Sequence, residues 1–276
     1  MTDRKEEEKM ALTLQSAKQD LRTRPFIFVA YSAYTNLPYV TCDEETFNDQ
    51  VWFFFREEDI KEFGKKKAED KILLRAVKFE RKNYLQLYSL LYSIGVNSVV
   101  WNKSGQKLEI EIGELAKQAD LSKLEESKRP LVNPTLQLSG IYFMQELRRP
   151  VSQEEHGDVR SLEEEVLANL VKSEYLVPFI PDKEDPKKMM IPFVKTKDGK
   201  NFRPVCSDVF EMQKFAGKVK MALAKIPFEG LLKSLPNQAD GVIINPAGFN
   251  MALPKENLSR LAEAMQADDG EDDEEE

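Results

Sequence analysis

Apolar and polar residues along this chain follow two different periods, and stretches of one period alternate with stretches of the other. Apolar residues recur every three or four positions, as in a helix with one buried face, at Met10, Leu14, Ala17 and Leu21. They recur every second position, as in a strand with one solvent-exposed face, at Leu108, Ile110 and Ile112, which alternate with Glu109 and Glu111. Helices interleaved with such strands predict an α/β (α+β) fold, in which helices pack on a mixed β-sheet.

The same succession of elements can be traced twice along the chain. The first half predicts a helix, strands and a second helix, in the order 10–21, 26–30, 37–41, 72–79 and 84–93, followed by the strand and turn VVWNKSG at 99–105. The second half predicts the same order at 162–170, 175–180, 201–206, 219–226 and 228–235, followed by VIINPAG at 242–248. Because similar blocks occur in the same order, we interpret the chain as a tandem duplication of one domain.

Composition places the domain boundaries. We expect a first, diverged domain over 1–126 and a second domain over 161–267. The sequence between them, 127–160, is polar and contains prolines, so we expect a linker there, with a strand-like insert at 135–138. The segment 268–276, DDGEDDEEE, holds eight acidic residues, and we expect it to be a disordered tail. A basic partner for this tail is the alternative interpretation.

The charge balance and the rare residue types exclude several functions. Without the eight acids of the tail, 40 of the 48 acidic residues remain against 40 basic ones, so the body is neutral and we expect no nucleic-acid partner. A single histidine, His156, and the isolated cysteines Cys42 and Cys206 predict no metal site, no cofactor and no disulfide, as in a reduced cytoplasmic protein. The first 25 residues have no apolar core, and no apolar run reaches membrane-spanning length, so we expect neither a secretory signal nor a membrane partner.

The second copy resembles the SseB family, named for an enhanced-serine-sensitivity trait in bacteria. The family's opening strand corresponds to Val177–Pro178–Phe179, its P-V-F-T-S/D strand to residues 204–208, and its G-V-V-I-N-P segment to residues 241–246. The first copy departs from this pattern, since Lys103 replaces the proline and Trp101 stands where Ile244 does. The resemblance implies two tandem SseB-like domains in a bacterial cytoplasmic protein, and it implies no catalytic mechanism.

Candidate ligand-binding residues follow the strands. Asn245-Pro246-Ala247-Gly248 has the residues of a type I turn, and Asn102-Lys103-Ser104-Gly105 keeps only the asparagine and the glycine. Ligand contact by the side chains of Asn102 and Asn245 is the alternative. The Ser207–Asp208 and Cys42–Asp43 steps each end a strand before a helical stretch, where they would either cap the helix or offer a nucleophile or an anion site.

Candidate interface residues lie on the helix over 84–93. Tyr84, Tyr88 and Tyr92 share one face with Leu87 and Leu91. Packing in the core is one interpretation of this stripe, and a partner-binding face is the other, because tyrosine is enriched at interfaces.

Two functional hypotheses remain. The first is a non-enzymatic interaction or scaffold protein with a protein partner, favoured by the duplication, the neutral body and the lack of a recognisable catalytic set. The second is a small-metabolite sensor or enzyme, with a pocket at the strand ends of the second domain near Asn245 and Ser207. The arrangement of the polar groups distinguishes them: convergence on a concave pocket would favour a sensor, and separate turns and caps would not.

Overall fold

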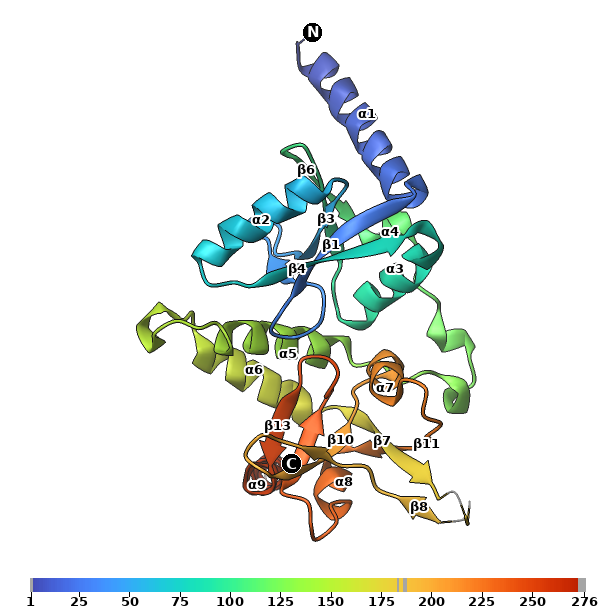
Figure 1. Ribbon diagram of the computed structural model, residues 1–276, viewed down its shortest axis with the longest axis vertical. Coiled ribbons are helices and arrows are strands. Elements are labelled where there is room, and N and C mark those ends of the chain that lie inside the picture. The colour runs from blue at the N-terminus through green and yellow to red at the C-terminus, as the bar shows by residue number, and fades with distance from the viewer. Residues whose placement is uncertain (1, 183, 186–187, 273–276) are drawn as a thin grey trace. The chain divides into compact units, whose positions relative to one another are not determined.

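The chain divides into two compact units (Figure 1). The structure is a computed structural model that describes residues 2–182, 184–185 and 188–272. The first unit contains Met1–Lys123 with Arg148–His156, and the second contains Leu124–Leu147 with Gly157–Glu276. Both units combine helices with mixed β-sheets, so the predicted α+β class is confirmed.

A mixed sheet forms the centre of the first unit. Its elements are α1 (Thr2–Thr23), β1 (Phe26–Ser32), β2 (Val40–Cys42), β3 (Asp49–Phe54), α2 (Glu57–Glu69), β4 (Leu74–Glu80), α3 (Tyr84–Ser93), β5 (Ser98–Lys103), β6 (Gln106–Glu111) and α4 (Ile112–Leu115). The strand order is β4-β1-β3-β5-β6, and β2 pairs with β3. Strand β3 runs parallel to β5, and the other pairs are antiparallel.

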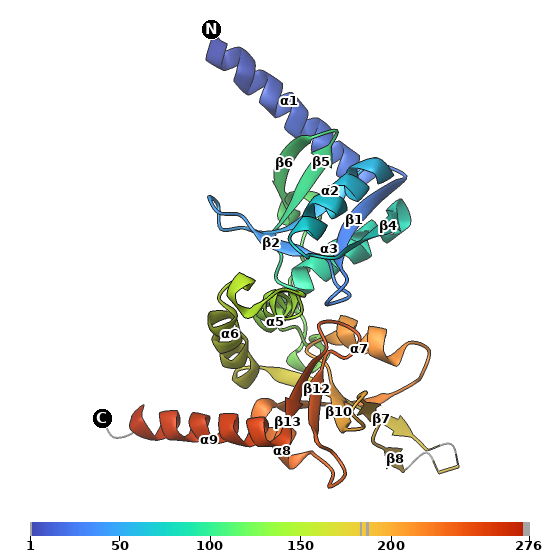
Figure 2. The same ribbon diagram turned by 60° about the vertical axis from the view of Figure 1, so that its left-hand side comes forward.

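Helices cover both faces of this sheet (Figures 1 and 2). On the face of α2, Ala30 and Phe54 of the sheet pack with Ile60 of the helix in one buried cluster, to which Phe28 and Phe63 add. Helices α3 and α4 lie on the opposite face. The apolar run 52–55, WFFF, falls largely in β3, which explains why it lacks polar alternation: both faces of this central strand are covered.

The second unit contains α5 (Pro134–Leu147), α6 (Val159–Val171), β7 (Glu174–Pro181), β8 (Met189–Met190), β9 (Val194–Lys195), β10 (Asn201–Val205), α7 (Val209–Ala216), β11 (Ala222–Pro227), α8 (Phe228–Lys233), β12 (Gly241–Ile244), β13 (Met251–Pro254) and α9 (Lys255–Asp272). Strand β10 lies parallel to β12 and antiparallel to β9, and β12 is antiparallel to β13. Strand β7 pairs with β11 and β8, and a bridge between Leu176 and Cys206 joins it to β10. Followed through this bridge, the order β11-β7-β10-β12-β13 has the same sequence of directions as β4-β1-β3-β5-β6.

Three sequence-based expectations are wrong in detail. The strand-like insert at 135–138 is the start of α5: Pro134 occupies the first helical position, which proline favours, and the buried Leu136, Gly140 and Phe143 follow helical spacing. The counterpart of the strand over 201–206 is β3 rather than the strand over 37–41, since β3 and β10 each run parallel to a later strand. Helix α9 extends to Asp272, so residues 268–272 of the expected disordered tail are helical, and residues 273–276 lie outside the described part.

Candidate functional site

Three of the predicted site residues meet at the carboxyl ends of the parallel strands β10 and β12. Ser207, Asp208 and Asn245 are each 0% exposed. The Ser207 N–H donates to Asn245 Oδ1 (2.8 Å), and the Asn245 side-chain amide donates in return to Ser207 Oγ (2.8 Å). This reciprocal pair joins the ends of the two strands through side chains, beyond the last rung of the ladder between Val205 and Ile244.

Asp208 forms the centre of the cluster and is the N-cap of α7. Its Oδ1 accepts the N–H groups of Phe210 (2.8 Å) and Glu211 (2.9 Å). Its Oδ2 accepts from Ser207 Oγ (2.9 Å) and from the side-chain amide of Gln137 on α5 (2.6 Å). With four donors the buried carboxyl is fully hydrogen-bonded, so the capping interpretation holds for Asp208.

Glu211 is a buried acid that the sequence did not single out. It is 0% exposed, its Oε1 pairs with Lys214, and its Oε2 has no hydrogen-bond partner among the described residues. Burial raises the pKa of Glu211 above its ordinary value, against the opposing effect of Lys214. A Cβ added at Gly248 would collide with Oε2, so the backbone of the VIINPAG turn lies directly against this carboxyl.

Helix α5 covers the ends of the strands. Besides Gln137, the loop before α5 contributes Asn133, whose amide donates to the carbonyl oxygens of Glu174 (2.8 Å) and Ser207 (2.6 Å). A Cβ on Gly140 would lie 2.9 Å from the fully buried ring of Phe249, so only glycine allows this close packing. The carboxyl ends of parallel strands are a common place for ligands, and here protein atoms fill it.

Neither cysteine is suited to act as a nucleophile. Cys206 is buried beside this cluster, and burial, with smaller contributions from Glu211 and Asp208, raises its pKa well above the ordinary value. Cys42 is exposed, and its pKa is also raised, by partial burial and by Asp49 and Asp43. A thiol with a raised pKa is protonated at neutral pH, whereas the thiolate is the reactive form.

The corresponding residues of the first unit do not form a similar cluster. Asn102 lies near the end of β5, in a tight hairpin that turns through Ser104 and Gly105, both at positive φ (54° and 86°). This is the two-residue turn typical of hairpins, not the predicted type I turn starting at Asn102. Asp43 accepts the N–H groups of Glu45 and Thr46 in a turn that leads into β3, so the Cys42–Asp43 step precedes no helix. In the second unit the Gly248 N–H does donate to the Asn245 carbonyl (2.8 Å), as the predicted turn requires.

The tyrosine stripe belongs to the core of the first unit. Tyr84 and Tyr88 are 5% and 3% exposed, and their hydroxyls donate to the carbonyl oxygens of Arg24 (3.1 Å) and Leu21 (2.7 Å). The partner-binding prediction is therefore wrong for these two residues, because their side chains and their hydroxyls are already engaged. Tyr92 is partly exposed, and its hydroxyl donates to the Ala116 carbonyl (2.8 Å).

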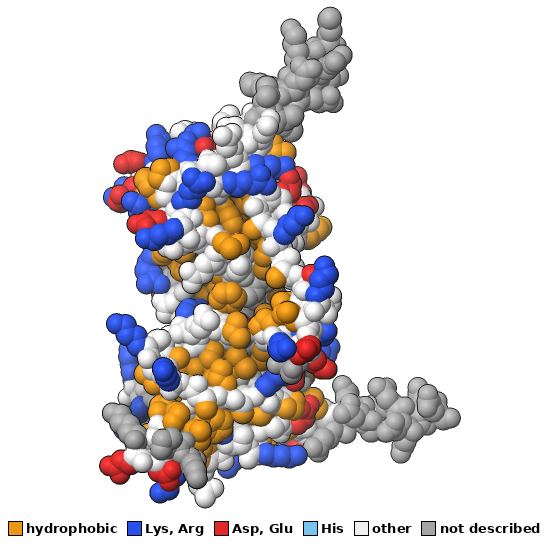
Figure 3. All heavy atoms as spheres, turned by 90° about the vertical axis from the view of Figure 1, so that its right-hand side faces the viewer, with side chains coloured by type: hydrophobic (Ala, Val, Ile, Leu, Met, Phe, Trp, Pro, Cys, Tyr) orange, Lys and Arg blue, Asp and Glu red, His pale blue; other side chains and the backbone are white. Residues whose placement is uncertain are grey.

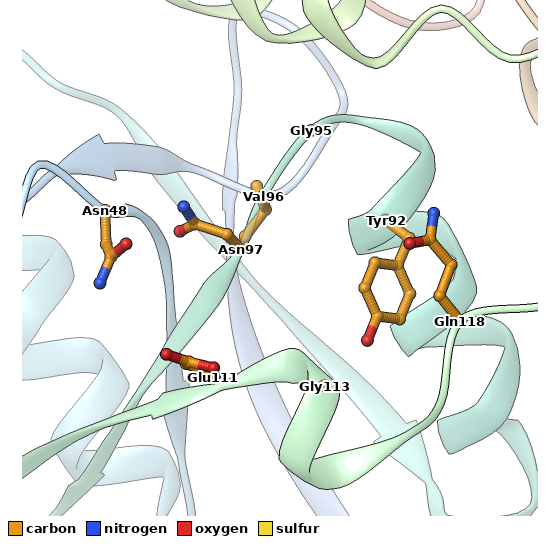
Figure 4. A pocket seen from close by; sticks show the side chains of 8 residues that line it. All are labelled: Asn48, Tyr92, Gly95, Val96, Asn97, Glu111, Gly113 and Gln118. Atoms are coloured by element: carbon orange, nitrogen blue, oxygen red, sulfur yellow. The ribbon is translucent and has the colours of Figure 1, made fainter.

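A pocket of about 460 Å³ lies in the first unit (Figure 4), lined by Asn48, Tyr92, Gly95, Val96, Asn97, Glu111, Gly113 and Gln118. Figure 4 shows Tyr92 and Gln118 together on one side, with Asn48 on the other. Asn97, Glu111 and Gln118 are exposed, so the pocket is wide and wet. It presents amide groups and one carboxylate to solvent and contains no nucleophile paired with a base.

Within the described ranges, no three His, Cys, Asp or Glu side chains are grouped so as to hold a metal ion. Within the same ranges, no helix combines the length and the apolar character needed to cross a membrane.

Comparison with known proteins gives a family match that covers much of the second unit. Residues 154–260 match the SseB protein N-terminal domain. The match includes Ser207, Asp208, Glu211 and Asn245, and it begins after α5. Gln137 and Gly140, which cover the strand ends, are therefore outside the matched SseB segment. The first unit lies almost entirely outside it, so the match does not extend to the predicted tandem arrangement.

Two solved structures are similar over much of the chain but superpose poorly. Tic22 from Plasmodium falciparum is 12% identical over 91% of this chain and 97% of its own, with a TM-score of 0.21. Anabaena Tic22 (protein transport) is 11% identical over 83% of this chain and 91% of its own, also with a TM-score of 0.21. We draw nothing about fold or function from them. Among curated proteins, none matches the sequence significantly.

The sequence patterns did not identify Gln137 and Glu211 as members of the cluster, and the reason differs for each. Gln137 lies in the stretch predicted as a strand in a linker, where no site was expected. Glu211 stands three residues after Asp208, a spacing typical of a capping box with an exposed acid, so nothing marked it as buried.

Proposed function

We propose that this chain is a non-enzymatic interaction or scaffold protein of the bacterial cytoplasm, built from two SseB-like domains. The observation that carries the proposal is the state of the predicted ligand-binding residues. In the second unit they converge, yet Ser207, Asp208 and Asn245 are fully buried and bonded to one another and to α5. Buried polar groups that are hydrogen-bonded to one another stabilise the fold, and they offer no free donor or acceptor to a ligand.

The tandem arrangement in this proposal is supported by topology. The two units share an order of five strands with the same directions. In each unit the chain forms a helix, a strand and a second helix between the two strands that run parallel. The SseB match to residues 154–260 supports the identity of one copy. The proposed divergence of the first copy is supported by the different residues at its strand ends. Arg56 is the residue before α2, whereas Asp208 is the residue before α7.

A ligand screen tests the proposal against the metabolite-sensor alternative. We expect the full chain to show no thermal shift with amino acids and common metabolites. A true ligand at about 100 times its Kd would add about 2.7 kcal/mol to the free energy of unfolding, which corresponds to several degrees. A shift that disappears in Gln137→Ala or Ser207→Ala would place a ligand in the cluster and contradict the proposal.

A co-purification experiment tests for protein partners, with the tagged full chain expressed in a bacterial cytosol. We expect partner proteins to co-purify in a fixed ratio to the bait, as specific association requires. If the bait is recovered alone under mild crosslinking as well, the scaffold function is wrong.

A further inference from the structure

The pocket of the first unit lies where three neighbouring strands begin or end. Asn48 directly precedes β3, Asn97 directly precedes β5, and Glu111 is the last residue of β6. Because β3 and β5 are parallel and β6 is antiparallel to β5, these three positions fall at the same edge of the sheet. The buried cluster of the second unit is at the carboxyl ends of its parallel strands, whereas this pocket is at the amino ends.

Hydrogen bonds fix the frame of the pocket. The Asn97 N–H donates to the Asp49 carbonyl (3.2 Å), and the Ile112 N–H donates to the Asn97 carbonyl (3.0 Å), so the three strands are joined at this edge. The Tyr92 hydroxyl donates to the Ala116 carbonyl (2.8 Å) and ties α3 to the end of α4. The pocket is therefore preformed, and its volume of about 460 Å³ is typical of ligand sites.

Several polar side chains of the pocket are free to bind a ligand. Asn97, Glu111 and Gln118 make no side-chain hydrogen bond or ion pair with another described residue. Tyr92, the candidate interface tyrosine that is not buried, adds its ring to the wall (Figure 4). Ser98 stands opposite Glu111 in the β5–β6 register, so both side chains are on one face. The Ser98 hydroxyl is fully buried and has no hydrogen-bond partner among the described residues.

Carboxylates without an ion pair surround the pocket. Glu109 lies next to it and accepts a hydrogen bond from the Asn48 side-chain amide (2.7 Å). Glu111 lines the pocket, and Glu44 and Glu45 are exposed in the loop that leads into β3. None of these four carboxylates pairs with a cation among the described residues.

Few cations balance these acids. No lysine or arginine is among the residues that line the pocket. Lys107 lies over the ring of Trp52, 5.0 Å from its centroid, and Lys117, which precedes Gln118, is one exposed cation. The charge balance at this edge of the sheet therefore favours a cationic ligand.

Phe47 places an exposed aromatic ring beside the pocket. It stands between Thr46 and Asn48, whose side chains both donate to Glu109 (3.4 and 2.7 Å), and it is 78% exposed. Aromatic side chains of this kind often anchor a partner protein. Figure 3 shows a broader hydrophobic area on the second unit, where apolar contact alone does not indicate the chemistry of a partner. At Phe47 the neighbouring carboxylates and amides do indicate it.

We propose that this pocket binds an arginine side chain of a partner protein, with an apolar residue next to that arginine packed on Phe47. The inference rests on the proposed interaction function and names the partner's chemistry. A guanidinium group has five N–H donors in a planar fork and pairs with a carboxylate through two parallel hydrogen bonds. It suits Glu111 and the amide oxygens of Asn97 and Gln118, and its plane stacks on an aromatic ring such as that of Tyr92.

The test uses the full chain and three labelled peptides that differ at one position. All three have the same apolar residues on both sides of a central arginine, lysine or citrulline, the last being the uncharged analogue of arginine. We expect fluorescence anisotropy at low salt to show at least about tenfold tighter binding of the arginine peptide than of the citrulline peptide, with the lysine peptide between them. The difference shrinks at high salt because exposed charges are screened.

Two variants locate the binding, and a third is the matched control. Glu111→Gln removes a charge without changing size, and it should weaken the arginine peptide about fivefold while leaving the citrulline peptide nearly unchanged. Phe47→Ala should weaken both peptides by about fivefold, because both lose the apolar contact. Glu58→Gln changes an exposed glutamate of α2, which follows the end of β3 rather than its start, and should leave binding unchanged. Circular dichroism checks that each variant folds.

Several results would overturn the inference. One is equal affinity for the arginine and citrulline peptides, or no binding by any peptide. A second is equal weakening by Glu58→Gln and Glu111→Gln, which would place the arginine elsewhere. If free arginine binds as tightly as the peptide, the pocket serves a small molecule, and the proposed interaction function loses its support as well. If the peptides fail while protein partners still co-purify with the full chain, the arginine inference is wrong and the interaction function stands.

Discussion

At the scale of single residues, Glu211 has an unusual environment for an acidic side chain. It is fully buried, one carboxyl oxygen pairs with Lys214, and the other lies against Gly248 without a hydrogen-bond partner among the described residues. An unpaired buried oxygen favours the neutral carboxyl, because protonation removes the charge that burial penalises. The raised pKa of Glu211 is therefore a property of its packing, and it links the stability of the fold to pH.

The sign of that link gives a first prediction. The folded protein holds the Glu211 proton above the ordinary pKa of 4.5, where the unfolded chain has released it. Stability is therefore lost as the pH rises from about 4.5 through the folded pKa, with a slope of up to about 1.4 kcal/mol per pH unit. Glu211→Gln cannot titrate, so the free energy of unfolding of the wild type should fall relative to this variant as the pH rises. Urea unfolding of both proteins between about pH 5 and 8 measures the difference, and two parallel curves would contradict the prediction.

At the scale of elements, sequence patterns predicted those parts whose periodicity is set by burial. The tyrosine-bearing helix over 84–93 and the β5–β6 pair are at the expected positions because each has one buried face. The stretch over 135–138 was predicted as a strand because four residues of alternating polarity fit either period, and only Pro134 and the later Gly140 and Phe143 distinguish a helix. The residues of the cluster also divide into those that a local pattern predicts and those that it does not. Ser207, Asp208 and Asn245 could be found because strand ends carry turn and cap residues, whereas the contact with Gln137 depends on where α5 docks, which no local pattern encodes.

The docking of α5 predicts opposite effects for one substitution in two helices. Replacing a helical glycine by alanine normally stabilises by about 1 kcal/mol. Gly64→Ala in α2 should do so, because a Cβ there meets nothing within 4 Å. Gly140→Ala in α5 should instead destabilise by about 1–3 kcal/mol, because its Cβ would lie 2.9 Å from the buried ring of Phe249. Chemical unfolding followed by circular dichroism compares the two, and stabilisation by both variants would show that α5 does not pack as described.

At the scale of the whole molecule, each unit carries the features of an independent folding unit. The first has a buried cluster around Ala30, Phe54 and Ile60, and the second has one around Leu176, Cys206 and Met212. The sequence predicted a similar order of elements in the two halves, and both units share an order of five strands. Their boundaries were not, because the segment predicted as a linker is shared: α5 belongs to the second unit, and Arg148–His156 belongs to the first. A single sequence shows which segments are apolar, but it does not show which of two similar cores each segment joins.

Tryptophan placement allows the two units to be followed separately. Trp52 and Trp101, the only tryptophans of the chain, both lie in the first unit, whereas circular dichroism reports helices of both. Because each unit buries its own core, we expect two cooperative transitions. Gly64→Ala should then move the fluorescence transition to higher denaturant, and Gly140→Ala should lower the midpoint of part of the dichroism signal while leaving fluorescence unchanged. If Gly140→Ala shifts both probes by the same amount, the units unfold as one, and the expectation of two transitions is wrong.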